Sequence, residues 1–293
     1  MTGSDKTAIV FRLRDGRLLG YAEFGNLEGK PVFYFHGYPA SRLEGRFLDR
    51  VAARHGVRLI AVDRPGMGLS DFKPGRTILD WPDDVVELAD TLEIDRFAVE
   101  GMSGGGPYSA ACAYKIPERL TACGIVGGMG PIDLGTQGMM RRNIVTFFAA
   151  RRMPWLLRLL LWWSIGRHSR DIENMEKLLL QGSEELPEPD RKIFLDDRLR
   201  RLFAEETCEA FRQGAKGLTY EGKLYAKPWG FNLKDISMKV YLWHGELDVN
   251  VPISMGRAVA ETIPNCQAKF YAQEAHISTA LNHLDETIET LTS

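Results

Sequence analysis

Residues 96–106 read RFAVEGMSGGG and contain the most specific signal in the chain. Their first half, residues 96–100, reads as a strand and is followed by Gly101. Small and apolar residues then recur at helical spacing from Pro107 to Ile116, and Pro117 ends that pattern. The sequence therefore predicts a serine, Ser103, in a tight turn between a strand and a helix.

The turn contains the pattern Gly101-x-Ser103-x-Gly105, which is typical of a nucleophilic serine. Such a serine has strained backbone angles, and side chains two residues away on either side would collide with neighbouring strands or the helix. The helix that follows directs its positive end at the turn, so the N–H of Gly104 is free to donate to an oxyanion. We expect Ser103 to be a nucleophile; a purely structural turn is the alternative.

Strands and helices alternate on both sides of this turn. A hairpin is expected at residues 11–24, and strands at 31–35, 58–62, 96–100, 122–127, 239–243 and 268–271. Near-continuous apolar strands separated by helices indicate an α/β fold with a parallel sheet that is covered on both faces.

The alternation is interrupted between Met139 and about Tyr225, where the pattern is helical throughout. We therefore expect an α/β core at residues 1–134 and 232–293 and a helical lid at 135–231. Residues 139–170 carry seven arginines and no acid, whereas residues 171–209 carry twelve acids and six bases. Two explanations remain open: ion pairing within the lid, or a cationic face for anionic substrates or a membrane surface.

A second loop is expected near the serine. His36-Gly37-Tyr38-Pro39 follows the strand at 31–35, and a loop at that place can direct the N–H of Tyr38 at the oxygen that Gly104 also serves. We expect the side chain of His36 itself to be structural and to bond the loop backbone.

A serine hydroxyl needs a neighbouring base, and the base needs an acid that holds its tautomer. His276 follows the last strand, at the edge of the sheet where the strand ends face the serine, and is the expected base. Asp248 follows the strand at 239–243 and is the expected acid, with Glu246 and Asp133 as alternatives. The remaining histidines are assigned to surface, packing or lid positions: His55, His168, His244 and His283.

Composition excludes several classes of protein. The formal charge is −2, which gives no sign of a nucleic-acid partner, and 26% charged with 44% hydrophobic residues is ordinary for a globular protein. Four scattered cysteines and a polar N-terminus without a signal-peptide pattern favour a cytoplasmic protein. The most apolar stretch, 155–165, is interrupted by Arg158 and is too short to span a bilayer. No His or Cys spacing indicates a metal site.

Taken together, these motifs resemble those of the α/β-hydrolase superfamily. The shared features occur in family order: the His36-Gly37-x-Pro39 turn, the Asp63-Arg-Pro-Gly-x-Gly-x-Ser70 loop, the Gly101–Gly106 elbow, Asp248 and His276. The resemblance covers the chain outside the lid and implies an eight-stranded, mostly parallel sheet with the active site under the lid. The first loop also looks like that of epoxide hydrolases and haloalkane dehalogenases, whose nucleophile is aspartate. Ser103 at that place favours acyl chemistry instead.

The resemblance and the residues together predict a serine hydrolase that cleaves a carboxylic ester, thioester or lactone without metal or organic cofactor. The lid aromatics would suit a substrate with an apolar acyl or aromatic part, although packing of the lid explains them nearly as well: Phe147, Phe148, Trp155, Trp162 and Trp163. Three alternatives use the same fold: a carbon–carbon bond hydrolase, a cofactor-free perhydrolase or haloperoxidase, and a ligand receptor with little turnover.

Overall fold

The chain folds around one eight-stranded sheet, described here for residues 6–293 from a computed structural model. The strands are β1 (Ile9–Arg12), β2 (Leu18–Gly25), β3 (Lys30–Phe35), β4 (Val57–Val62), β5 (Phe97–Met102), β6 (Leu120–Val126), β7 (Val240–Gly245) and β8 (Cys266–Tyr271). Their order is β1-β2-β4-β3-β5-β6-β7-β8. The β1–β2 and β2–β4 pairs are antiparallel and all others are parallel. The mostly parallel eight-stranded sheet implied by the resemblance is confirmed.

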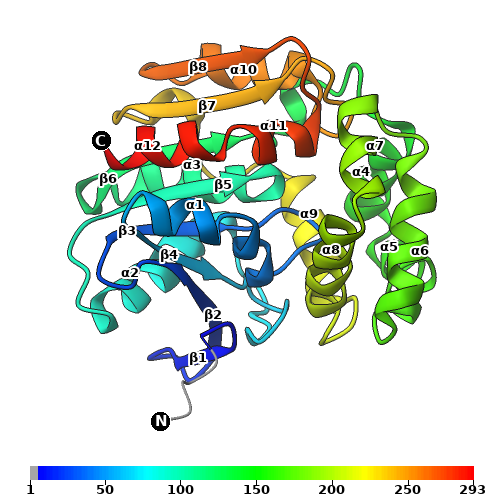
Figure 1. The fold of residues 1–293 in the computed structure, drawn as a ribbon, viewed down its shortest axis with the longest axis horizontal. Coiled ribbons are helices and arrows are strands. Elements are labelled where there is room, and N and C mark those ends of the chain that lie inside the picture. Colours follow the sequence, from blue (N-terminus) through cyan, green and yellow to red (C-terminus); the bar gives the residue numbers. More distant parts are fainter. Residues whose placement is uncertain (1–5) are drawn as a thin grey trace.

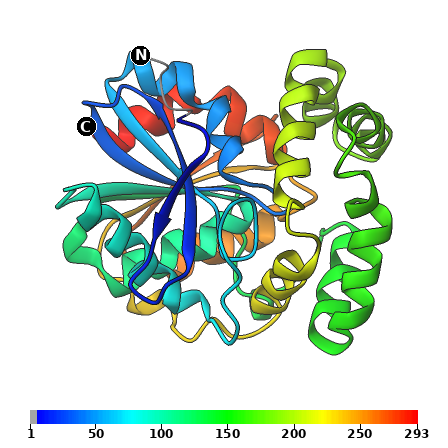
Figure 2. The same ribbon diagram turned by 90° about the horizontal axis from the view of Figure 1, so that it is seen from below.

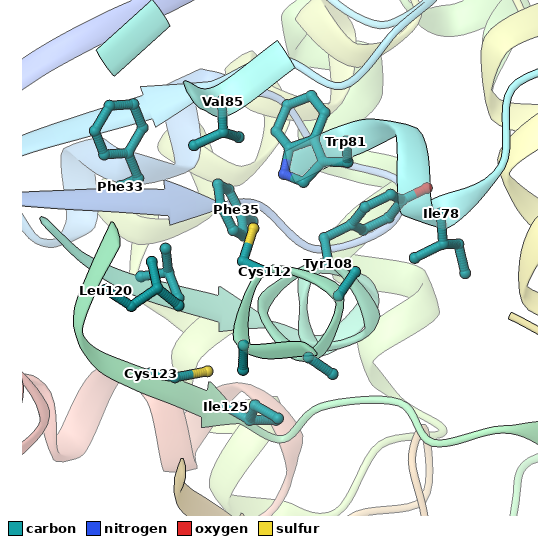
Figure 3. Packing of buried hydrophobic residues seen from close by; sticks show 14 of the residues in the cluster. Phe33, Phe35, Ile78, Trp81, Val85, Tyr108, Cys112, Leu120, Cys123 and Ile125 are labelled. Carbon is teal, nitrogen blue, oxygen red and sulfur yellow. The ribbon is translucent and has the colours of Figure 1, made fainter. Parts of the chain in front are cut away.

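Helices cover both faces of the sheet, as Figure 2 shows. The core helices are α1 (Asp49–Arg54), α2 (Trp81–Thr91), α3 (Gly106–Lys115), α10 (Ile253–Thr262), α11 (His276–Asn282) and α12 (Leu284–Thr292). Alternate residues of β3 point to opposite faces: Phe33 and Phe35 join the core formed with α2 and α3, while Val32 and Tyr34 join the core formed with α1 and α12. Figure 3 shows Phe33 and Phe35 in the first of these cores. A strand buried on both faces is apolar at every position, which is why the runs in the sequence do not alternate.

Six further helices are inserted between β6 and β7. They are α4 (Arg141–Arg152), α5 (Pro154–Ser164), α6 (Ile172–Ser183), α7 (Glu188–Leu195), α8 (Asp197–Ala210) and α9 (Lys216–Tyr225). Figure 1 shows this insertion on the side toward which the arrowheads of β5 and β7 point. It therefore lies at the carboxyl ends of the parallel strands, where ligands of open α/β sheets bind.

The insertion contains fewer internal ion pairs than would be needed to balance its charges. Of the seven arginines at 139–170, only Arg142 lies within ion-pair distance of a carboxylate among residues 6–293, 3.7 Å from Glu185. The acids of 171–209 pair instead with arginines of their own segment, such as Glu176 with Arg201 at 3.1 Å, or with the core. Within residues 6–293, every helix is too short or too polar to span a bilayer.

Candidate active site

Ser103 occupies a sharp turn between β5 and α3, with a φ of 52°. This left-handed backbone is costly for a residue with a side chain. Glycine is needed on either side: a Cβ on Gly101 would lie 2.4 Å from the carbonyl oxygen of Gly105, and one on Gly105 would lie 2.0 Å from that of Phe35. The turn has the steric form that the sequence pattern requires, and it holds the serine at the carboxyl end of the sheet.

Three predicted side chains meet at this point. Nε2 of His276, the first residue of α11, lies 2.9 Å from Oγ of Ser103, and Nδ1 lies 2.6 Å from Oδ2 of Asp248. The other oxygen of Asp248 accepts the N–H groups of Asn250 and Val251, each at 2.8 Å, which fixes the carboxylate. The structure thus brings residues from the ends of β5, β7 and β8 into one line.

The surroundings of His276 favour the tautomer that a general base needs. When Nδ1–H donates to Asp248, Nε2 is left to accept the proton of Ser103. Burial lowers the pKa of His276, but the charge and the hydrogen bond of Asp248 outweigh burial and leave that pKa above its usual value. These contacts therefore stabilise the protonated form of His276 in place.

The other histidines and acids have different partners. Nδ1 of His36 lies 2.9 Å from the carbonyl oxygen of Gly37, and burial together with Arg64 holds the pKa of His36 well below its usual value, so this side chain is a neutral structural group. The remaining ring contacts are His55 with Asp285, His168 with Arg167, His244 with the Val251 carbonyl, and His283, between α11 and α12, stacked on Tyr271. Of the alternative acids, Glu246 pairs with Arg257 and Asp133 is exposed.

The loop after β3 lies against the elbow. A Cβ on Gly104 would be 2.9 Å from Cβ of Tyr38, and one on Gly37 would be 3.6 Å from Cβ of Ser103. The two backbone segments expected to hold an oxyanion, at Tyr38 and Gly104, are therefore neighbours beside the serine.

Sequence reasoning missed the side chain that holds this loop. Arg64 is fully buried and donates to the carbonyl oxygens of His36 and Gly37, the latter at 2.7 Å. Its Nε also donates to Glu221 of α9, at 2.6 Å. Arg64 belongs to the Asp-Arg-Pro-Gly motif, so its neighbourhood could be predicted, but its partner could not.

Helix α9 completes the support. The second carboxylate oxygen of Glu221 accepts from Arg76, and the hydroxyl of Tyr225 lies 2.8 Å from the carbonyl oxygen of Gly104. Burial alone would raise the pKa of Glu221, but Arg76 and Arg64 lower it to about 2. One helix of the insertion thereby fixes both the loop and the elbow.

A second missed residue is Asp190 of α7, which is fully buried. Its carboxylate accepts the N–H groups of His276, Ile277 and Ser278 at 3.1, 2.9 and 2.8 Å. These are the first residues of α11, whose N–H groups have no partner within the helix and favour an anion. A carboxylate from the insertion thus anchors the backbone of the histidine. Nothing in the sequence distinguishes it from the other acids nearby.

A cavity of about 610 Å³ opens onto Ser103 and His276. Most of its wall is apolar and comes from both core and insertion, including Phe47, Met129, Phe147, Leu161, Met175, Leu179, Phe194, Phe203 and Leu281. Of the five aromatic residues expected to suit a substrate, only Phe147 lines it. Helix α5 packs through Leu157 and Leu161, four residues apart, and this turns Trp155, Trp162 and Trp163 outward.

Residues 6–293 contain no group of three or more His, Cys, Asp or Glu side chains arranged to hold a metal ion.

Comparison with known proteins agrees with this architecture. A sequence profile described as alpha/beta hydrolase fold matches residues 30–280. A non-heme chloroperoxidase from Streptomyces lividans is 31% identical over 120 residues, which cover 40% of this chain and 44% of that protein. The chain thus matches less than half the length of this relative.

Solved structures match along nearly the whole chain. An esterase from Rhodococcus sp. ECU1013 has a TM-score of 0.69 at 20% identity and covers 98% of this chain and 99% of its own. An enol-lactonase from Burkholderia xenovorans LB400 has a TM-score of 0.64 at 18% identity, and the match covers 96% of this chain and 97% of the lactonase. Identities this low show the fold alone, but the profile match covers most of the sequence. The chain therefore belongs to the α/β-hydrolase fold family.

Proposed function

We propose that this chain is a serine hydrolase that cleaves carboxylic esters through an acyl-enzyme on Ser103, with thioesters and lactones as variants of the same chemistry. The observation that carries the proposal is the line from Asp248 through His276 to Ser103, with contacts of 2.6 and 2.9 Å. A hydroxyl becomes a good nucleophile only when a base within hydrogen-bond reach takes its proton.

In the first half-reaction, Oγ of Ser103 attacks the ester carbonyl carbon while Nε2 of His276 takes the hydroxyl proton. The carbonyl oxygen becomes negative, and the N–H groups of Tyr38 and Gly104 hold it. His276 then gives its proton to the leaving alcohol as the carbon–oxygen bond breaks. In the second half-reaction His276 takes a proton from water, whose oxygen attacks the acyl carbon. The bond to Oγ of Ser103 then breaks, His276 gives the proton to that oxygen, and the acid and the free serine are released. These steps require no metal or organic cofactor.

The insertion supplies the lid in this proposal: residues 135–231 cover a core made of 1–134 and 232–293. The apolar wall that α4 to α8 contribute suits an apolar acyl or aromatic part of the substrate. Two of the similar structures, an esterase and an enol-lactonase, support acyl chemistry. Because the Streptomyces relative is a chloroperoxidase, the assay should also offer peroxide in place of water as the acceptor of the acyl group.

The test is the variant Ser103→Ala. The control is Ser254→Ala, because Ser254 lies on the surface, where its hydroxyl donates to the carbonyl of Gln137. We expect Ser103→Ala to fold normally, to lose at least about 10⁴-fold in kcat on nitrophenyl butyrate, and to lose labelling by a fluorophosphonate. Ser254→Ala should retain both properties. Ester cleavage that survives Ser103→Ala would show that the nucleophile is another group.

The same panel separates the alternatives. A receptor would be labelled but turn over negligibly, a carbon–carbon hydrolase would prefer diketones to esters, and a perhydrolase would form peracid when peroxide is added. Each of these outcomes would replace ester hydrolysis as the main activity.

A further inference from the structure

Three carboxyl groups that the proposed reaction does not use line the same cavity as Ser103. Glu44 comes from the 3₁₀ turn Arg42–Phe47, Glu100 from β5 and Glu206 from α8. Their exposed fractions are 8%, 3% and 4%. A buried carboxylate is costly unless it is paired, so this cluster requires an explanation.

The cluster has fewer hydrogen-bond donors than its carboxylate oxygens could accept. Oε2 of Glu100 and Oε2 of Glu206 have no hydrogen-bond partner among residues 6–293. Glu44 does have one, because its Oε2 accepts the N–H of Gly37 at 2.6 Å. An ionised carboxylate only accepts hydrogen bonds, so the groups missing from this pocket are donors.

The cluster also lacks a buried cation. Arg64, whose charge acts on Glu44, is committed to Glu221. Arg42, on the same turn as Glu44, is committed to Asp63 and Glu209. Arg46, which faces Glu206, is paired with Glu205 at 2.5 Å. Of the described cavity-lining residues, only Arg142 carries a guanidinium, and that side chain is half exposed, near Glu185.

The consequence is that the carboxyl groups resist ionisation, and that the charge of Glu44 repels the charges of Glu100 and Glu206. Burial raises the pKa of Glu44 to about 7, with Arg64, Tyr34, Gly37 and His276 acting against it. Burial, with repulsion from Glu44, raises the pKa of Glu100 to about 7 despite a hydrogen bond with Thr287.

Glu206 is affected in the same direction. Burial and the charge of Glu44 raise its pKa well above the usual value, and Arg46 offsets this only in part. A cation among the three would favour their ionised forms.

The cluster lies beside the proposed nucleophile. Among residues 6–293 no three carboxylates are arranged to hold a metal ion. A Cβ on Gly37 would lie 3.3 Å from Oε1 of Glu44 and 3.6 Å from Cβ of Ser103, so the carboxylate and the nucleophile flank one glycine. Negative charge here would also oppose the oxyanion unless a cation balances it.

We propose that Glu44, Glu100 and Glu206 bind a protonated amine of the substrate, so that the preferred substrates are esters whose acyl or alcohol part ends in an ammonium group. An ammonium supplies N–H donors for the free oxygens and the missing positive charge. The apolar wall formed by Phe47, Phe203 and Leu281 accommodates the methylene chain between the amine and the ester. This inference rests on the proposed ester hydrolysis at the same site.

The test uses pairs of esters that differ only in a terminal ammonium or methyl group. One pair is 6-aminohexyl butyrate and heptyl butyrate; the other is nitrophenyl 6-aminohexanoate and nitrophenyl heptanoate. We expect kcat/KM to favour the ammonium member of at least one pair by about tenfold or more at pH 8, and the preference to fall below pH 7 as the carboxyl groups protonate.

The preference should fall at least about fivefold in Glu206→Gln and in Glu100→Gln. Glu205→Gln is the matched control on the same helix, because Glu205 pairs with Arg46 and Arg201, and it should leave the ratio unchanged. Preference for the methyl member in both pairs, or a ratio insensitive to Glu206→Gln, would overturn the inference.

Failure of ester hydrolysis itself is recognised separately, because then neither member of either pair is cleaved. Calorimetry with n-hexylammonium still tests the pocket in that case. Binding with proton release near pH 7 supports the amine site, whereas no binding, or binding equal to that of n-hexanol, contradicts it.

A different observation, on the outer surface of α4 and α5, carries a second inference. Eight large apolar side chains are exposed there: Ile144, Val145, Phe148, Trp155, Leu159, Leu160, Trp162 and Trp163. Apolar patches of this kind mark interaction sites. We call these residues, with the arginines among them, the α4–α5 outer surface.

Arginines alternate with the apolar residues along this surface. On α4, Arg141, Val145, Phe148 and Arg152 follow each other at helical spacing, and on α5 Arg158 lies between Trp155 and Trp162. Six of the seven arginines at 139–170 have no ion pair among the described residues: Arg141, Arg151, Arg152, Arg158, Arg167 and Arg170. A second copy packed on this surface around a two-fold axis would bring two positively charged surfaces together, which disfavours self-association.

We infer that the α4–α5 outer surface docks on an anionic lipid bilayer. Tryptophan prefers the membrane interface, and arginine can extend its charge to lipid phosphates while its methylenes remain among apolar groups. Vesicle flotation tests this: we expect at least tenfold stronger binding to vesicles of phosphatidylcholine with phosphatidylglycerol than to phosphatidylcholine alone, and weakening by salt.

The double variant Arg151→Glu/Arg158→Glu should abolish that difference, whereas Arg198→Glu, on α8 outside the surface, should preserve it. Equal binding to both vesicles, no binding to either, or a stable dimer that buries this surface would overturn the inference.

Discussion

Helices α9 and α5 belong to the same insertion, but their sequences and their surroundings are opposite. Helix α9 reads KGLTYEGKLY, and six of its ten residues are buried; α5 reads PWLLRLLLWWS, and two of its eleven are. The polar helix is therefore inside and the apolar helix outside. Hydrophobicity alone would assign them the other way round.

Helix α9 can be buried because each of its buried polar side chains has a partner: Thr219, Glu221 and Tyr225. Glu221 satisfies Arg64 and Arg76, and a Cβ on Gly217 would lie 2.0 Å from the carbonyl oxygen of Gly66, so the helix rests directly on the core backbone. In helix α5 only Leu157 and Leu161 are buried, and both lie on the side that faces the rest of the protein. Helix α9 is therefore part of the proposed catalytic framework, whereas the outer face of α5 is exposed.

The largest effect should come from Glu221→Gln. Removing this charge leaves two buried guanidinium groups without their counter-ion, and breaking a buried pair in this way costs about 3–5 kcal/mol. Urea unfolding measures the loss. The matched control is Glu176→Gln on α6, whose carboxylate pairs with the exposed Arg201 and should contribute less than about 1 kcal/mol. Equal costs for the two variants would remove the distinction between α9 and the rest of the insertion.

Lowering the pH should reduce the free energy of unfolding of the wild-type protein in the same way, because it protonates Glu221. The pKa of Glu221 falls from its ordinary value of 4.5 to about 2 on folding, against the effect of burial, because of Arg76 and Arg64. Its stabilisation is therefore complete above pH 4.5 and is lost as the pH falls toward 2. The difference in unfolding free energy between wild type and Glu221→Gln should shrink over that window. A difference that is constant with pH would mean that the charge of Glu221 is not what stabilises α9.

An intermediate effect is expected at Asp190, on activity rather than folding. Asp190→Asn weakens the bonds to the backbone of His276 and should lower kcat by about 10- to 100-fold through misplacement of the imidazole. Asp190 also helps to raise the pKa of His276. The acid limb of the kcat/KM profile should therefore move to lower pH in the variant, and Asp190→Glu should restore part of kcat. A fall in kcat with an unmoved profile would indicate a purely structural role.

Sequence reasoning succeeded where the chemistry is local. Gly101, Ser103 and Gly105 are specified by one turn, and the strands around them by apolar runs that two covered faces require. It placed His276 and Asp248 by the ends of their strands, since the carboxyl ends of parallel strands meet at one edge. Their catalytic roles stay predictions.

It failed where partners come from the insertion. Glu221 and Asp190 are single acids in a helical segment rich in charge, and the rotation of each helix against the core depends on contacts that no local pattern encodes. The outward position of Trp155 was missed for the same reason. Periodicity shows that α5 has an apolar stripe, but its residues are apolar nearly all round, so the stripe does not reveal which side is covered.

The smallest effect should come from substitutions on the exposed face of α5. Trp155 is 68% exposed, whereas Leu157, two residues later, is 1% exposed. In lipid-free buffer, Trp155→Ala should change the unfolding free energy by no more than about 0.5 kcal/mol, since it removes few contacts. Leu157→Ala should cost about 2–5 kcal/mol, because it opens a cavity against α9. Should Trp155→Ala cost more than about 2 kcal/mol, and more at higher protein concentration, then a second copy covers this surface and the lipid inference does not stand.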